Sequence, residues 1–116
     1  MERVSPYGKS FAQLNALYEE RRIVGASHPF LTEALADYTA EAAESAALYA
    51  LAIEQAATFT DEPTHTKHIG LAEALISLGR LAEAREHLII GQRQARSAGD
   101  SHWVDHAAEL SRSLVA

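Results

Sequence analysis

The chain has 116 residues and a formal net charge of −6, and 47% of its residues are hydrophobic. This length fits one domain with a core of its own, and the absence of cysteine excludes disulfides and thiolate metal sites. No apolar run approaches the roughly 20 residues that span a bilayer, and the sequence Met1–Pro6 lacks the apolar core of a secretion signal. We therefore expect a cytoplasmic protein that does not contact membranes.

The negative charge is concentrated between Ile23 and Thr66, a segment that contains no lysine or arginine. The carboxylates of this segment are Glu33, Asp37, Glu41, Glu44, Glu54, Asp61 and Glu62. A field of this sign repels phosphate backbones, so we expect no binding to nucleic acid. It favours a basic partner surface, or it is a solvated face that keeps the protein soluble.

The first helix is predicted within residues 1–25, because Ser5 can cap a helix and Pro6 is favoured in its first turn. An apolar stripe follows at helical spacing, formed by Tyr7, Phe11, Leu14 and Tyr18. From Phe30 to Phe59 there is no glycine or proline. The segment 30–60 is either one long helix or a hairpin that breaks near residues 39–44, and we favour the break because the stacking of hairpins needs one.

The second half of the chain contains clearer boundaries. Pro63 and its neighbours end one segment and begin the next, and Gly79 can supply the left-handed turn at the end of a helix. Gly99 repeats that signal and is followed by a last apolar stripe. The predicted helices are 64–78, 81–98 and one within 101–115, so the expected fold class is all-α.

The chain also resembles itself after a shift of 39 residues, in a pattern of small and large side chains. Ser45, Tyr49 and Ala52 fall on Ala84, Leu88 and Gly91. Small residues in these positions allow the two helices of a hairpin to pack closely. We therefore predict a single domain, 1–116, of antiparallel helical hairpins stacked as a short α-solenoid of five or six helices; coincidence in an alanine-rich chain is the alternative.

Residues 64–98 form the best-matching unit and resemble a tetratricopeptide repeat. The residues that carry the resemblance are Leu71, Ala72, Leu75, Gly79, Leu81, Ala84 and Leu88. His68 stands where the family favours a bulky aromatic residue, and Gly91 stands where alanine is usual. The ending Ala98-Gly99-Asp100 is similar to the longer repeats of bacterial regulatory proteins. The segment 45–59 and the expected capping helix in 101–115 match in part, and residues 1–25 do not match.

The resemblance implies a non-enzymatic scaffold, in bacterial regulation, that binds a partner peptide or helix on a concave face. The positions that would line this face are Thr66, Ile69, Glu73, Ile76, Ser77, Asp105, Ala108 and Arg112. Ile69 and Glu73 stand where members that bind a C-terminal carboxylate carry lysine and asparagine. We therefore expect an amphipathic partner with some positive charge. The alternative is that Ile69 and Ile76 are buried under the adjoining helix.

A second hypothesis is a self-associating homodimer. A short stack exposes apolar surface at its ends unless these are capped. The last helix ends in Leu114-Val115-Ala116 with little polar covering, which favours a two-fold dimer.

Metal-dependent or enzymatic function has weaker signals. His65 and His68, and likewise His102 and His106, each lie on one helix face, but no HExxH sequence is present. The acidic residues of 33–44 lack the ExxH arrangement of metal–carboxylate bundles. No nucleophile elbow or phosphate-binding loop occurs. We therefore expect no enzyme activity, no metal and no cofactor.

Overall fold

The computed structural model describes residues 28–59 and 61–114, which form five helices and no strand. The helices are α2 (Pro29–Asp37), α3 (Ala42–Ala56), α4 (His65–Ser77), α5 (Leu81–Ser97) and α6 (Ser101–Ser113). The predicted all-α class is therefore confirmed. The helix expected within 1–25 lies outside the described residues.

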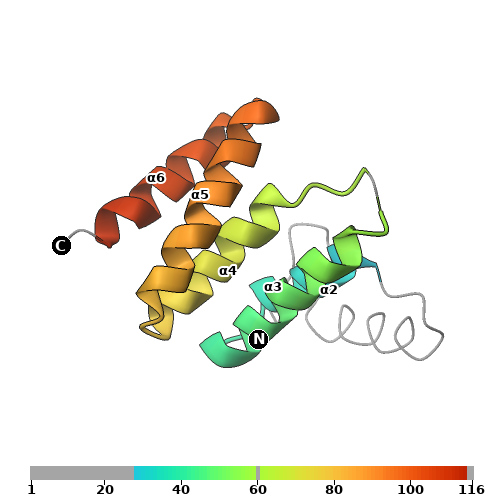
Figure 1. Cartoon of the computed structure of the whole chain (residues 1–116). Coiled ribbons are helices and arrows are strands. Elements are labelled where there is room, and N and C mark those ends of the chain that lie inside the picture. The colour runs from blue at the N-terminus through green and yellow to red at the C-terminus, as the bar shows by residue number, and fades with distance from the viewer. Residues whose placement is uncertain (1–27, 60, 115–116) are drawn as a thin grey trace, which may run out of the picture.

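The helices form a row in which each one packs against the next along the chain (Figure 1). The most extensive contact joins α4 to α5, and α6 packs on α5 and also touches α4. Short connections reverse the chain from α2 to α3, from α4 to α5 and from α5 to α6, which gives the predicted arrangement of stacked hairpins. None of the helices in the described ranges is long and apolar enough to cross a membrane.

The segment 30–60 is divided into two helices, α2 and α3. Tyr38 caps the end of α2, and Glu41 takes an extended backbone conformation before α3. The Thr39 hydroxyl donates to the carbonyl of Leu35 at 2.8 Å, and the Ser45 hydroxyl donates to the carbonyl of Ala36 at 3.1 Å. These bonds satisfy carbonyl groups that the end of a helix leaves unpaired. Polar side chains thus stabilise a break that no glycine or proline marks.

The turns after α4 and α5 share one pattern of backbone bonds. Gly79 and Gly99 have φ angles of 75° and 71°, in the left-handed region that favours glycine. The amide of Arg80 donates to the carbonyl of Leu75, and the amide of Asp100 donates to that of Ala95, both at 2.9 Å. Each turn is therefore a Schellman motif, as the two glycines predict.

The core is made largely of small residues at the helix contacts. Ala72, Ala84 and Ala107 are completely buried, and α4 also contributes the larger Ile69 and Leu75. Because alanine has only a methyl group, the helix axes can approach closely and still fill the space between them.

A buried ion-pair cluster joins α2 to the start of α4. Lys67 is completely buried, and its Nζ donates to Glu33 at 2.9 Å, to Glu62 at 2.7 Å and to the carbonyl of Pro63 at 2.8 Å. An ammonium group has three donors, so all of them are used. Two carboxylates of the cation-free segment are therefore paired with the lysine that follows it, and the cluster keeps one net negative charge.

Candidate functional site

The structure brings together only part of the predicted concave face. Glu73 and Ser77 are exposed on α4, and Ile76 beside them is half-buried against the core. Ile69 is completely buried, which agrees with the alternative that the sequence left open, burial under the adjoining helix. The remaining positions are half-buried at Thr66 and Ala108 and exposed at Asp105 and Arg112.

The burial of Ile69 follows from a neighbouring glycine. A Cβ atom placed on Gly91 of α5 would lie 2.6 Å from Cγ1 of Ile69, which is closer than real Cβ atoms approach other atoms. The isoleucine therefore occupies the space that a side chain at position 91 would take, and it is buried between α4 and α5 rather than exposed.

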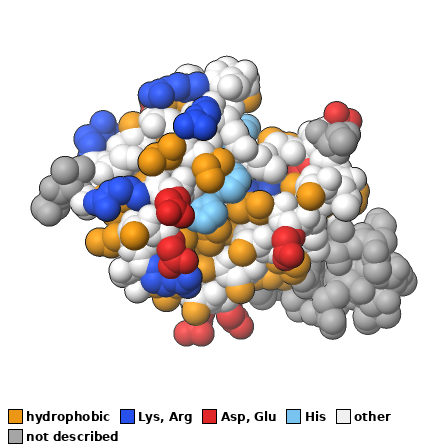
Figure 2. Space-filling model, in the orientation of Figure 1, with side chains coloured by type: hydrophobic (Ala, Val, Ile, Leu, Met, Phe, Trp, Pro, Cys, Tyr) orange, Lys and Arg blue, Asp and Glu red, His pale blue; other side chains and the backbone are white. Residues whose placement is uncertain are grey.

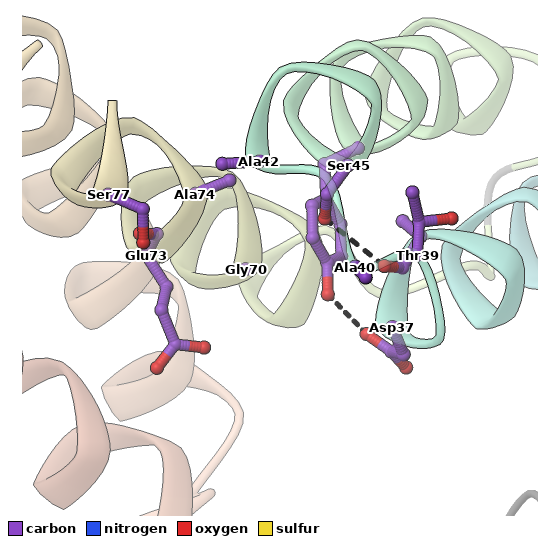
Figure 3. Close-up of a pocket in the computed structure, with 11 residues that line it drawn as sticks. Asp37, Thr39, Ala40, Ala42, Ser45, Gly70, Glu73, Ala74 and Ser77 are labelled. Carbon is purple, nitrogen blue, oxygen red and sulfur yellow. Dashed lines mark hydrogen bonds between the residues drawn. The ribbon is translucent and has the colours of Figure 1, made fainter. Parts of the chain in front are cut away.

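Glu73 and Ser77 line a pocket of about 200 Å³ between α4 and the end of α2. Figure 3 shows these two residues on one side of the pocket, with Asp37 and Thr39 on the other. Ala42 and Ser45 of α3 lie at its edge, and Gly70 lies on the α4 side. The described lining residues include the carboxylates of Asp37 and Glu73 but no lysine, arginine or histidine.

Asp37 is held in the pocket by Tyr49 of α3, whose hydroxyl donates to the Asp37 carboxylate. Burial above all, with the negative charges of Glu33 and Glu73, raises the pKa of Asp37 to about 6, although the Tyr49 hydrogen bond and the charge of Lys67 lower it. Burial and the charge of Asp37 also raise the pKa of the Tyr49 hydroxyl, which therefore stays protonated. The negative charge of the Asp37 carboxylate is therefore not fully balanced by positive charge in the pocket.

Gly70 allows Tyr49 to reach Asp37. A Cβ atom on Gly70 would lie 2.5 Å from Cε1 of the Tyr49 ring. The tyrosine therefore crosses α4 at the one position where that helix has no side chain. A larger residue at position 70 would displace the ring and, with it, the hydrogen bond that orients Asp37.

On the other side of Glu73, α6 contributes a histidine. Nε2 of His106 lies 3.6 Å from the Glu73 carboxylate, and the His106 ring makes an edge contact with Trp103. Trp103 itself packs on the core. The exposed face of α4 therefore has a carboxylate pocket toward α2 and an imidazole–indole contact toward α6.

Of the two pairs of histidines that the sequence places in one helix turn, only the first separates to different partners. His65 contacts the Asp100 carboxylate at 2.9 Å, whereas His68 contacts His87 of α5, with 2.9 Å between the two Nδ1 atoms. His102 and His106 both contact Trp103. Within the described ranges, no group of three histidine, aspartate or glutamate side chains is placed to hold a metal ion.

The sequence does not reveal that Asp37, Tyr49 and Gly70 line one pocket. It presents Asp37 only as one member of an acidic helix face, and Tyr49 only as a large residue in the repeat pattern. The available signal was Gly70, because a glycine inside a helix costs stability and indicates a close approach of another group. That signal does not identify the approaching residue.

Comparison with known proteins adds no family to this description. No protein-family model matches the chain, and neither a curated protein nor a solved structure is significantly similar to it.

Proposed function

We propose that this chain is a non-enzymatic, cytoplasmic interaction module that binds a basic, amphipathic segment of a partner protein on the exposed face of α4. The resemblance of residues 64–98 to a tetratricopeptide repeat supports this class of function. A role as an adaptor or regulator in a bacterium follows from the same resemblance.

The observation that carries the proposal is the pocket formed by Asp37, Glu73 and Ser77. Its described lining has two carboxylates and no cation, and the pKa of Asp37 is raised because burial and neighbouring carboxylates oppose its charge. A lysine or arginine side chain of a partner would supply the missing positive charge. Charged groups of this kind give specificity and fast association more than raw affinity.

The surroundings of the pocket suit the apolar side of the same partner. Ile76 lies on α4 between Glu73 and the end of the helix and is only half-buried. An amphipathic helix presents basic and apolar side chains at intervals of three and four residues. One face of such a helix could contact the carboxylates and Ile76 together.

The proposal is tested by titrating the full chain with a labelled amphipathic peptide rich in leucine and lysine, and following its fluorescence anisotropy. A peptide with glutamate in place of lysine is the matched probe. We expect the lysine peptide to bind more tightly, and the Asp37→Asn/Glu73→Gln variant to weaken that binding about tenfold, the effect of losing one or two partly exposed ion pairs.

The matched control is Glu44→Gln/Glu54→Gln, which removes two exposed carboxylates of α3 that do not line the pocket. This variant changes the net charge by the same amount as the pocket variant. Equal weakening by both variants would show that only the overall charge attracts the peptide, and the pocket would lose its role. Ile76→Asp should weaken binding while leaving the helical circular dichroism unchanged.

A second candidate function is self-association through α5. Ile89 and Ile90 are 57% and 38% exposed, which is unusual for two adjacent large apolar side chains in a helix. Leu81 on the same helix is 41% exposed. Arginine side chains lie over the α5–α6 end of the molecule (Figure 2), whereas α2 and α3 contain neither lysine nor arginine.

Sedimentation equilibrium separates the two candidates. Self-association through α5 predicts a dimer at micromolar concentration that Ile89→Lys converts to a monomer. A monomeric wild-type chain at the same concentration would exclude this candidate and leave the peptide-binding proposal unaffected.

A further inference from the structure

The α4–α5 contact, the most extensive in the described fold, has a pair of histidines in it. His68 of α4 is 9% exposed, and His87 of α5 is half-buried. Their rings stack at an angle of 24° with centroids 5.1 Å apart, and their Nδ1 atoms are 2.9 Å apart. This distance requires one shared proton, because two lone pairs or two N–H groups would repel each other.

We propose that the His68–His87 pair is an acid-sensitive latch, which holds the α4–α5 hairpin closed while the two rings share one Nδ1 proton and opens it when both rings are protonated.

The chemistry of the two rings gives the latch a defined sequence of steps. In the neutral pair, one ring donates its Nδ1–H to the Nδ1 lone pair of the other. A first added proton can bind to Nε2 of the donor ring, so the bond between the rings survives and becomes charge-assisted. A second proton must bind to the acceptor Nδ1, where it meets the N–H of the donor. The hydrogen bond is then replaced by the contact of two cations.

The surroundings assign the order of the two protons. Burial lowers the pKa of His87, but the carboxylates of Glu86 and Glu83 on its own helix raise it in part, and Glu83 is in turn held by Arg80 at 2.5 and 2.8 Å. His68 is buried more deeply, and none of the described carboxylates opposes the effect of burial there. His87 therefore takes the first proton, and His68 is the ring whose protonation opens the latch.

The neighbouring helices leave the second charge uncompensated. The groove beside His87 is lined from α3 by Ala43, Ala46, Ala47 and Ala50, and its charged lining residues in the described chain are Arg80 and Glu83. On the other side, Gly91 holds the helices so close that its added Cβ would lie 3.3 Å from Cβ of His68. This close packing leaves the His68 ring little room to move away from His87 while α4 and α5 stay in contact.

Protonation equilibria give the size and the pH range of the effect. Burial, together with the neighbouring His87, lowers the pKa of His68 to about 4, whereas an unfolded histidine has a pKa near 6.5. A lowered pKa means that the folded hairpin loses stability as the pH falls from 6.5 toward 4. The opening equilibrium of α4–α5 should therefore rise about 100-fold between pH 7 and pH 4 through His68 alone.

The test is amide hydrogen exchange of the full chain at several pH values, corrected for the intrinsic exchange rate at each pH. We expect the protection of α4 and α5 to fall on acidification by about this factor in the wild type. The double variant His68→Phe/His87→Leu removes both titrating rings, and position 68 is one where the resembling family carries a bulky aromatic residue. Its α4–α5 protection should lose the part of the acid response that His68 contributes, which leaves only the response of the other titrating groups.

The matched control is His102→Gln, which removes an exposed histidine of α6 that contacts Trp103 but neither ring of the pair. Its acid response should equal that of the wild type. An equal acid response in the double variant would overturn the latch. If the double variant does not fold, the side-chain ¹⁵N shifts of the wild type decide. The latch requires one Nδ1–H and one Nε2–H tautomer at neutral pH, and two ordinary titrations near pH 6.5 would refute it.

Discussion

Ile69 of α4 fills the space that a side chain at Gly91 of α5 would need, since an added Cβ at residue 91 would lie 2.6 Å from Ile69 Cγ1. The two residues are 22 positions apart in the sequence and form one continuous contact in the core. This contact sets the distance between α4 and α5, and it explains why residue 91 is a glycine inside a helix.

Gly91→Ala should therefore destabilise the fold, although alanine is the better helix former. Overpacking lowers the free energy of unfolding by about 1–3 kcal/mol, and the higher helix propensity of alanine offsets up to about 1 kcal/mol of this loss. We expect a lower urea midpoint with an unchanged slope. In an Ile69→Ala background the overlap with Ile69 is gone and only the contacts with the His65 carbonyl at 3.2 Å and His68 Cβ at 3.3 Å remain, so the same substitution should cost less. A destabilisation of equal size in both backgrounds would contradict the packing argument.

Removal of Lys67 should be the most costly single substitution among the polar residues described. Lys67→Met leaves Glu33 and Glu62 close together without their counter-charge, and breaking a buried ion pair costs about 3–5 kcal/mol. The variant Lys67→Met/Glu33→Gln/Glu62→Gln removes the charges together and should recover much of this loss. Chemical denaturation of the two variants measures the difference. Failure of the triple variant to recover would mean that the bond to Pro63, not the ion pairs, dominates.

The pocket gives Asp37 an opposite pH dependence to that of the histidine latch. Burial, with the nearby carboxylates, raises the pKa of Asp37 to about 6 from 3.8. A raised carboxyl pKa means that the contribution of Asp37 to stability is greatest below pH 3.8 and is lost as the pH rises through 6. Asp37→Asn keeps an acceptor for Tyr49 and should stabilise the protein at pH 7 but not near pH 4. Denaturation midpoints at the two pH values measure this, and an equal shift at both would be inconsistent with the raised pKa.

The two glycines with positive φ should tolerate substitution differently from Gly91. No atom lies within 4 Å of a Cβ added at Gly79 or Gly99, so the cost of alanine there is limited to the backbone. Gly79→Ala and Gly99→Ala should each cost about 1–2 kcal/mol. Asparagine tolerates the left-handed conformation better and should cost less than alanine at both positions. Thermal unfolding of the four variants provides the measurement, and equal losses for alanine and asparagine would argue against backbone strain.

The sequence predicts those features of the fold that depend on local chemistry. Gly79 and Gly99 indicate two turns because few other residues adopt the required backbone, and both turns form as expected. The break before Glu41 could not be decided, since the hydroxyls of Thr39 and Ser45 that stabilise it become distinctive only once the helices are placed.

The candidate site was less predictable than the fold, because its residues meet across three helices. Glu73 and Ser77 are exposed on α4, as a place on an open face requires. Asp37 and Tyr49 lie beside them because Gly70 has no side chain to block the Tyr49 ring. Ile69 is buried because residue 91 is a glycine. Each of these outcomes depends on a pair of residues distant in sequence, which a pattern within one helix does not reveal.

The matching turns after Leu78 and Ala98 close with the same two backbone bonds, although the helices that follow them differ in sequence. The direction in which the chain returns is therefore a property of the local backbone. Side chains of α5 and α6 can change without altering either turn, provided that each glycine stays in place.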